Sequence, residues 1–495
     1  MTWLTGWNYR KPITISNSGS ALTDYQVSIT VDTATLVTAG KLQSTCNDIR
    51  FTSSDSLTSL NYWIESGPNT VSTKIWVKIT SILASPYTTT IYMYYGNTGA
   101  TSASNGINTF IFFDDFNGNT YTDRWTVVQQ NSYSAISESS GNLNLSHGGG
   151  PGYCSDGVVV SATGLSSGSN IEYIFKIASL SGDGYQSAAI SLSGSGSWQG
   201  YYSCSANALI IPANAYQLTM GGTGIALNNI ASSVSTNVAS GSIPSSPFWL
   251  KIIYQTPNIV VYYSTNSGSS WTQSLSYGSA ISKTGTIGML TGGCCDHAGT
   301  LYINEIIARQ SVPTAPTVSV EPGEQIPPGS LRITSTPSGA LIYVALHNQT
   351  PASTGIYTPD PVTNLPPGYY DIRLTKNGYA DWTFGNAEIV SNTEMQISAT
   401  MATLANIGAL SMTVSPPSES PCRAGICTVD VSVTWKNTGG LSGLSDLSIT
   451  VSGGTPTITL PVYSSVSFAA NEEITRTFTV SNMIAGTHSI CPNPN

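Results

Sequence analysis

The stretch YQVSITV, residues 25–31, alternates apolar and polar side chains without a break. Ile75, Val77 and Ile79 repeat this period of two, and so does VDVSVTW at 429–435. Successive side chains of a strand point to opposite faces of a sheet, so this period buries one face and leaves the other in water. Strands of this kind near both ends of the chain predict an all-β protein.

The composition suits a long chain made of strands. The protein has 495 residues, of which 9% are charged and 40% are hydrophobic. Domains usually hold about 100 to 200 residues, so this length predicts three to five of them. Neutral polar side chains with few charges are typical of sheets that face water. We therefore expect tandem β-sandwiches, arranged as elongated beads on a string.

Charge and hydropathy exclude two kinds of partner. The formal net charge is -9, and no Lys/Arg cluster lies among aromatic side chains. Such a chain offers no basic surface to phosphates, which excludes nucleic acid. No run of about 18 apolar residues occurs, so no membrane span is expected. Residues 1–10 lack a charged segment followed by an apolar one, so either a signal peptide has been removed or export takes another route.

The first predicted domain spans residues 1–110. Its aromatic-rich phrases are WNYRKPI at 7–13, DIRF at 48–51, YWIE at 62–65 and YYGN at 94–97. Together they resemble a β-sandwich domain of unknown function found in archaeal and bacterial surface proteins. The resemblance covers nearly all of this domain and implies a place on a cell surface.

The second predicted domain spans residues 111–312. It opens with FFDDF at 112–116 and closes with YINEI at 302–306, with WLKI at 249–252 and VVYY at 260–263 between them. The set resembles a laminin-G or concanavalin A-like jelly roll, in which the final strand returns beside the first.

Three further segments complete the chain. Residues 313–328 hold five prolines and no apolar periodicity, which predicts a semi-rigid linker. Residues 329–403 carry the turn formers TPSGA at 336–340 and PPGY at 366–369 between short apolar strands, and they resemble a PEGA domain. Residues 404–495 alternate Val429, Val431, Val433 and Trp435 before NTG at 437–439, and they resemble an adhesion-type Ig-like domain.

The sequence lacks the signatures of an enzyme. The four histidines lie in three predicted domains, and no His-Glu-x-x-His phrase occurs. Glycoside hydrolases need two carboxylates beside the scissile bond, and no Glu-x-Asp-x-x-Glu phrase is present. We interpret the isolated acids Glu172, Asp183 and Glu305 as solvated strand ends. The sequence therefore predicts that the protein is not an enzyme.

Eight cysteines favour disulfides and an oxidising compartment. In the second domain we predict that Cys154 and Cys204 pair with the adjacent Cys294 and Cys295, in an order that the sequence leaves open. With neighbouring histidines the same cysteines offer the alternative of a soft-metal site. Adjacent strand residues point to opposite faces, however, and rarely bind one ion.

The last domain offers a bond between Cys427 and Cys491, which leaves one of its three cysteines over. Cys46 stands alone in the first domain. The leftover thiols are either buried or join successive subunits into a homopolymer.

Two ligand sites follow for the jelly roll. Laminin-G-like domains often hold one calcium ion at the rim of the sandwich, so the resemblance implies Ca2+ bound by Asp114, Asp115 and Asn117. No other cofactor is expected.

Carbohydrate recognition uses exposed aromatic platforms beside hydrogen-bonding groups. Trp198, Tyr201 and Tyr202 lie in a Gly/Ser-rich stretch near Asp183 and Tyr185, and these five residues form the predicted carbohydrate site. The alternative is that the aromatic side chains pack inside the sandwich.

The phrases NLS at 144–146 and NQT at 348–350 make Asn144 and Asn348 candidates for N-glycosylation.

These features predict a non-catalytic extracellular surface or appendage protein, which adheres to glycans or surface proteins through its jelly roll. Two alternatives stay open. The chain could be a structural protomer of a filament, sheath, surface layer or virion, with the virion surface as its location. It could also be a polysaccharide-processing enzyme.

Overall fold

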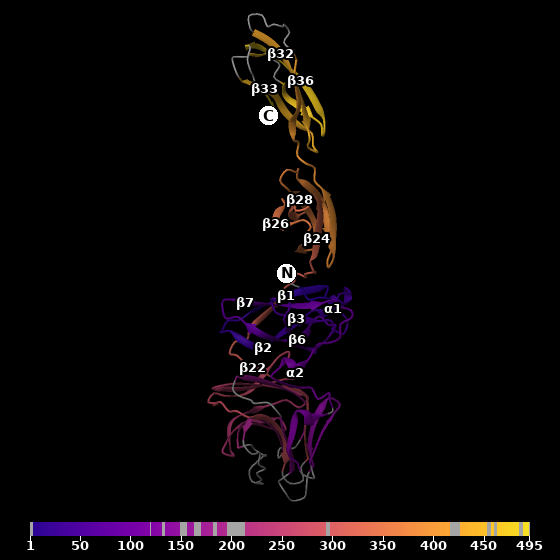
Figure 1. The fold of residues 1–495 in the computed structure, drawn as a ribbon. Helices are drawn as coiled ribbons and strands as arrows, with labels where there is room; N and C mark the ends of the chain where they lie inside the picture. Colours follow the sequence, from indigo (N-terminus) through magenta and orange to yellow (C-terminus); the bar gives the residue numbers. More distant parts are fainter. Residues whose placement is uncertain are drawn as a thin grey trace. The chain divides into compact units, whose positions relative to one another are not determined.

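The structure is a computed structural model of the 495-residue chain. It describes residues 3–118, 120–130, 134–148, 156–162, 170–181, 186–195, 213–293, 298–415, 426–452, 457–459, 463–484 and 489–494. The chain forms two compact units, Thr2–Gln325 and Ile326–Asn495. Strands make up 61% of it and helices 3% (Figure 1), which confirms the predicted all-β fold of tandem sandwiches.

Two sheets form the first sandwich. One has the strand order β23-β1-β7-β3-β4 and the other the order β2-β6-β5. The strands and helices are β1 (Tyr9–Ser16), β2 (Leu22–Val31), α1 (Thr33–Thr38), β3 (Arg50–Thr52), β4 (Ser59–Leu60), β5 (Tyr62–Ser66), β6 (Thr73–Ile82), β7 (Thr88–Tyr95), α2 (Gly106–Thr109) and β23 (Thr317–Val320). Tyr25, Val27 and Ile29 of β2 are buried in its core beside Ile75 and Val77 of β6, so the alternating pattern is inward on every second residue.

The predicted linker at 313–328 is part of the first sandwich. Its residues Thr317–Val320 form β23, which pairs antiparallel with β1. Val318 and Val320 pack against the core, and Glu324 accepts hydrogen bonds from Lys41 and from the Tyr95 hydroxyl. The linker prediction is wrong for these residues. The prolines flank a short alternating stretch, and this stretch pairs with the backbone of β1, which would otherwise be an edge strand.

The jelly roll packs two larger antiparallel sheets face to face. The eight-stranded sheet has the order β10-β11-β22-β13-β18-β19-β20, with β8 also paired to β22. Its strands are β8 (Phe112–Asp114), β10 (Ser134–Ser139), β11 (Asn142–His147), β13 (Ile171–Ser181), β18 (Phe248–Gln255), β19 (Asn258–Ser264), β20 (Thr272–Tyr277) and β22 (Gly299–Gln310). β22 returns beside β8, as the jelly-roll resemblance implies.

The second sheet of the jelly roll has seven strands in the order β17-β16-β15-β14-β21-β12-β9. Its strands are β9 (Trp125–Gln129), β12 (Asp156–Ala162), β14 (Gln186–Ser195), β15 (Asn214–Gly221), β16 (Gly224–Ala231), β17 (Val234–Ser242) and β21 (Thr286–Gly293), and the 3-10 helix η1 (Tyr121–Asp123) precedes β9.

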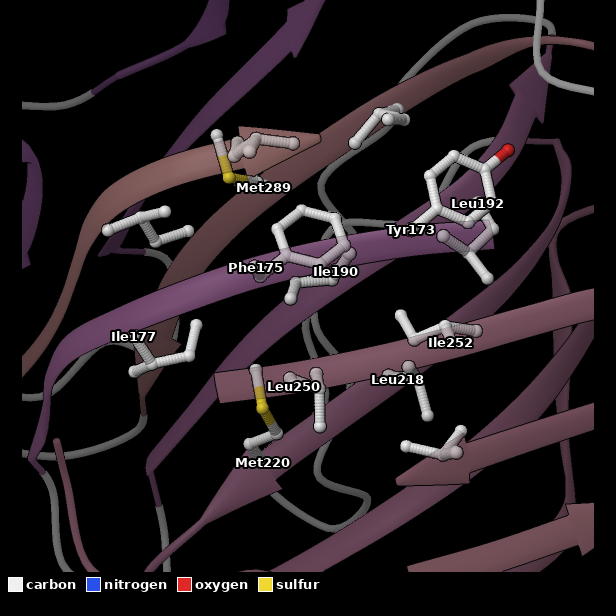
Figure 2. Packing of buried hydrophobic residues seen from close by; sticks show 14 of the residues in the cluster. Tyr173, Phe175, Ile177, Ile190, Leu192, Leu218, Met220, Leu250, Ile252 and Met289 are labelled. Carbon is white, nitrogen blue, oxygen red and sulfur yellow. The ribbon is translucent and has the colours of Figure 1, made fainter. Parts of the chain in front are cut away.

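Apolar side chains from both sheets fill the space between them. Tyr173 and Phe175 of β13 meet Ile190 and Leu192 of β14, with Leu218 of β15 beside them (Figure 2). All five are fully buried. Every second residue of these strands therefore faces the other sheet, and the residues between face away from the core.

The unit Ile326–Asn495 contains four smaller sheets. Two hold β24 (Gly329–Thr336), β25 (Leu341–Leu346), β26 (Ala352–Tyr357), β27 (Val362–Leu365), β28 (Gly368–Thr375), β29 (Trp382–Ile389) and β30 (Glu394–Thr400), with β24 and β30 parallel. The other two hold β31 (Ile407–Val414), β32 (Ile426–Asn437), β33 (Gly443–Ser452), β34 (Thr457–Thr459), β35 (Tyr463–Phe468), β36 (Glu473–Ile484) and β37 (Ser489–Pro494). Val431, Val433 and Trp435 of β32 are fully buried, as their alternation predicts.

Helices long and apolar enough to cross a membrane do not occur among the described residues.

Candidate functional site

The first sandwich covers the outer face of the eight-stranded sheet. Trp63 of β5 and Trp76 of β6 face each other across a strand pair on the side opposite their own core. They pack against Phe110 of the connecting segment, Phe113 of β8 and Ile307 of β22. Trp63 and Phe113 meet with ring centroids 4.8 Å apart. We call this buried contact, with the ion pairs beside it, the junction.

Paired charges lie within the junction. Lys176 of β13 contacts Glu305 of β22 at 2.7 Å and Glu65 of the first sandwich at 3.8 Å. Glu65 also pairs with Lys74 at 2.7 Å and accepts a 2.7 Å hydrogen bond from the indole of Trp76. Buried charges are expensive unless paired, and each of these carboxylates has a cationic partner.

Glu172 and Glu305 are not the solvated strand ends that we predicted. Each is only 8% exposed. Glu172 pairs with Arg309 at 2.9 Å, and the Arg309 guanidinium lies over the ring of Trp76. The prediction is wrong for these two acids because the first sandwich covers the sheet face on which they lie. The third acid, Asp183, lies outside the described residues.

Glu305 has the chemistry of a general acid but not its position. Burial raises its pKa to about 7, while the adjacent Lys176 opposes that rise. A carboxyl group with such a pKa resembles the acid of a glycoside hydrolase. In this chain it is enclosed beneath the first sandwich, so no substrate reaches it.

The predicted calcium ligands Asp114, Asp115 and Asn117 lie at the end of β8 and in the segment that follows it. Asp114 ends β8, and its two carboxylate oxygens accept hydrogen bonds from the Phe116 amide at 3.1 Å and the Trp125 indole at 2.8 Å. Burial raises the pKa of Asp114, which disfavours the anion that Ca2+ needs. Within the described ranges no three acidic, His or Cys side chains come close enough to hold a metal ion. Asp114 therefore fixes a turn, and calcium binding by Asp114, Asp115 and Asn117 stays a prediction.

An acid-rich cavity of about 440 Å³ adjoins this turn. It is lined by Asp115, Asp123, Glu138 and Arg124, and Arg124 donates a hydrogen bond to the Phe113 carbonyl. Asp114 also lines it, so two of the three predicted calcium ligands lie at its wall.

The outer face of the seven-stranded sheet carries a row of neutral polar side chains. Ser191 of β14 is paired with Gln217 of β15, Gln217 with Asn228 of β16, and Asn228 with Asn237 of β17. Their strand neighbours point into the core, so these four side chains lie on the opposite face. We call Ser191, Gln217, Asn228 and Asn237 the polar row.

Exposure increases along the polar row from the middle of the sheet to its edge. Ser191 and Gln217 are buried and joined by a 3.0 Å hydrogen bond. Asn228 is half-buried and donates to the Thr219 hydroxyl at 3.2 Å, and Asn237 is exposed. Asn237 accepts a 3.4 Å hydrogen bond from Ser240. The open end thus presents amide and hydroxyl groups in fixed positions.

Predicted carbohydrate residues Asp183, Tyr185, Trp198, Tyr201 and Tyr202 lie outside the described residues. The strand between them is β14, which has 10 residues. Residues 182–185 precede its first residue and residues 196–212 follow its last one. The two ends of β14, from which these segments start, are roughly 30 Å apart. Because the five residues lie in these segments, the prediction that they form a single carbohydrate site stays untested.

Most cysteines of the predicted disulfides cannot be placed. Cys154, Cys204, Cys294 and Cys295 lie outside the described residues, so both the disulfide and the soft-metal alternatives remain predictions. Cys46 is a free thiol with no exposed surface, which fits a buried thiol and not a bond between subunits.

In the last domain Cys427 lies on β32 and Cys491 on β37, in two different sheets. Their bond remains a prediction.

The two glycosylation candidates differ in their surroundings. Asn144 is half-buried in β11, between β10 and β22, and donates a 2.8 Å hydrogen bond to Ser139. Asn348 is exposed in the turn after β25. Only Asn348 has the surface turn that an acceptor asparagine needs.

Sequence reasoning missed the polar row and the junction. The polar row depends on the register of four strands, which sequence alone does not give. The junction had a signal, since Trp63 and Trp76 are large aromatic residues at positions that the alternation assigns to water.

Comparison with known proteins identifies two segments. Residues 45–128 match the family described as a domain of unknown function, DUF2341, and residues 328–403 match the PEGA domain. The first match runs from the first sandwich into β9 of the jelly roll. No curated protein matches the chain.

Solved structures give distant likenesses. A Bacillus subtilis protein of unknown function with a galectin-like fold is 13% identical, with 41% of this chain and 96% of that chain covered and a TM-score of 0.30. The exoplasmic/lumenal domain of VIP36, in a Ca2+/Man3GlcNAc-bound form, is 14% identical, with 39% and 86% covered and a TM-score of 0.30.

A GH43 protein from Bacillus licheniformis is 16% identical, with 44% of each chain covered and a TM-score of 0.29. Likenesses at this level carry no argument about function. The family matches and the fold together make this chain a multidomain β-sandwich protein that contains a DUF2341 and a PEGA domain.

Proposed function

We propose that this chain is an extracellular surface protein that binds glycans, without catalysis, on the outer face of the seven-stranded sheet. The polar row is the observation that carries the proposal. Sugar hydroxyls are bound by a few well-placed amide and hydroxyl groups, and the exposed end of the row offers Asn228 and Asn237 with Thr219 beside them. The PEGA match supports a place on the cell surface.

The arrangement of the two sandwiches supports the choice of sheet. The first sandwich covers the outer face of the eight-stranded sheet through the junction. The seven-stranded sheet is the one that packs on the other side of the jelly-roll core. A ligand that reaches a sheet face of the jelly roll therefore meets the exposed end of the polar row, at Asn228 and Asn237, and not the paired acids.

A binding role without turnover is supported by the condition of these acids. Glu172 and Glu305 are paired with Arg309 and Lys176 and are enclosed by the first sandwich. A glycoside hydrolase needs two carboxyl groups that face a bound sugar.

A glycan array probed with the full chain tests the proposal, followed by product analysis of every glycan that binds. Binding with intact glycan after long incubation is the expected result. Release of shorter saccharides would show an enzyme. A protein that binds no glycan but forms regular assemblies under the electron microscope would be the structural protomer instead.

A further inference from the structure

We infer that the saccharide bound by the polar row is neutral and that it binds without a metal ion. This inference rests on the proposed function and adds the chemical class of the ligand. It comes from the distribution of charge between the two sheets of the jelly roll, from the hydrogen-bonding capacity of the row, and from the condition of Asp114.

Charged residues are segregated between the two sheets. The seven strands β9, β12, β14, β15, β16, β17 and β21 together contain a single Asp, Glu, Lys or Arg, which is Asp156 at the start of β12. The strands of the eight-stranded sheet contain Asp114, Glu138, Glu172, Lys176, Lys251, Glu305 and Arg309. Within these described strands, the sheet that carries the polar row is therefore nearly free of charge, although the chain as a whole has a net charge of -9.

Lys283, a cation that contacts β15 and β16 of this sheet, is not available to a ligand. Lys283 donates hydrogen bonds to the carbonyls of Ala215 and Ile230 and to the side chain of Asn229, at 2.9, 2.6 and 2.6 Å. An ammonium group has three donors, so these contacts use all of them. The residue is 8% exposed, and the group neutralises no anion at the surface.

Hydroxyl groups of a neutral sugar match this face. Each sugar hydroxyl both donates and accepts, and so do the Asn, Thr and Ser side chains of the open end. A uronate or sulfate group only accepts and loses its hydration on binding, which is unfavourable without a cationic partner. The neutral face therefore favours hexose chains over acidic ones.

The geometry of the row sets the orientation of the ligand. Adjacent strands lie about 4.8 Å apart, so Asn228 and Asn237 repeat at a spacing close to the size of one pyranose ring. A linear saccharide that lies across the strands can place successive rings beside successive side chains.

Metal-mediated recognition is disfavoured by the donor set. Both carboxylate oxygens of Asp114, one of the three predicted calcium ligands, already accept protein hydrogen bonds. Asp114 also belongs to β8, which pairs with the eight-stranded sheet and not with the sheet that carries the row.

The test compares neutral and acidic oligosaccharides on the full chain. The neutral set is maltohexaose, cellohexaose and mannohexaose with the neutral members of the array, and the acidic set is tetragalacturonate and a heparin hexasaccharide. Each is titrated by calorimetry in EDTA and in CaCl2. The variant is N228A/N237A, and the matched control is N142A/N304A, which removes a hydrogen-bonded pair of asparagines from the eight-stranded sheet.

We expect a neutral glycan to bind equally in EDTA and in CaCl2, at least about fivefold more weakly to N228A/N237A, and unchanged to the control. Binding of acidic glycans alone, or loss of neutral binding in EDTA, would overturn this inference while glycan binding itself stands. Neutral binding that survives N228A/N237A would also overturn it, because the site would lie elsewhere. If no glycan of either set binds, the proposed function itself is wrong, and this inference is wrong with it.

Discussion

We expect Glu305 to make the stability of the unit Thr2–Gln325 depend on pH. Burial raises its pKa from an ordinary value of 4.5 to about 7, so the folded state holds this proton more tightly than the unfolded state does. The free energy that this raised pKa contributes to folding is fully present below pH 4.5, and it is lost as pH rises through about 7. It amounts to at most about 3 kcal/mol.

We predict that E305Q, which keeps the shape and removes the titration, flattens the fall in melting temperature of this unit between pH 5 and 8. Scanning calorimetry of the full chain at several pH values measures it. E138Q on the same sheet is the control and should melt like the wild type at each pH. An E305Q protein with the wild-type pH dependence would mean that Glu305 stays ionised in the junction.

The exposure of the two candidate asparagines predicts which of them accepts a glycan. Asn348 is exposed in a turn and has a positive φ of 67°, whereas Asn144 is half-buried within a sheet. An acceptor asparagine must reach an enzyme, which a turn permits and an interior strand does not. In a glycosylating host we expect glycopeptides that contain Asn348 and none that contain Asn144. N348Q should remove the added mass completely, and any mass that remains would place a glycan elsewhere.

At the scale of the element, β23 completes the first sandwich. It lies beside β1 through the pairs Ile13↔Val320 and Ile15↔Val318, and its two valines pack on the core. V318D would place a carboxylate against apolar side chains, at a cost of about 1–3 kcal/mol.

Hydrogen–deuterium exchange of the peptide that covers β1 measures this effect, because β1 becomes an edge strand when β23 detaches. We expect faster exchange in V318D and wild-type exchange in S319D, whose side chain lies on the exposed face of the same strand. Equal exchange in both variants would show that β23 does not protect β1.

Strand pairing also supports one of the predicted disulfides, the bond from Cys154 to Cys294 or Cys295. Asp156 begins β12 and is paired with Gly293, the last residue of β21. Cys154 precedes Asp156 by two residues, and Cys295 follows Gly293 by two residues. Both cysteines are therefore close in sequence to the same strand pair. Cys204 follows the other end of β14.

We therefore predict a bond from Cys154 to Cys294 or Cys295. Peptide mapping of the non-reduced protein identifies the partner. A Cys154–Cys204 peptide would contradict the prediction, and a fully reduced set of four thiols would favour the soft-metal alternative.

Local alternation was enough to predict the strands. The patterns at 25–31 and 429–435 form β2 and β32, because a period of two fixes which side chains face the core. Alternation does not say what covers the other face. Trp76 and Glu172 lie on faces that alternation assigns to water, and both are buried because another domain packs there. The sequence could not predict the polar row either. The row depends on the register of strands that are far apart in the chain, and alternation does not give that register.

At the scale of the whole molecule, the junction joins the first two sandwiches in one compact unit, and we expect them to unfold together. Aromatic side chains and paired charges fill it, and the DUF2341 match runs from the first sandwich into the jelly roll. Interfaces that are large and apolar couple the domains on either side, whereas polar contacts leave them free to move.

Trp76 is the residue whose loss should separate the two sandwiches. Its ring contacts Phe110 at a centroid distance of 5.7 Å, and its indole N–H donates to Glu65. Truncation of a buried tryptophan costs about 3–5 kcal/mol, and here the loss falls on the contact between sandwiches and not on either core. In W76A we expect the single calorimetric transition of Thr2–Gln325 to split into two, while W382A, in the other unit, leaves it single. If the wild type already melts in two separate steps for the first sandwich and the jelly roll, the junction does not couple them, because a shared buried interface would make the less stable sandwich melt with its neighbour.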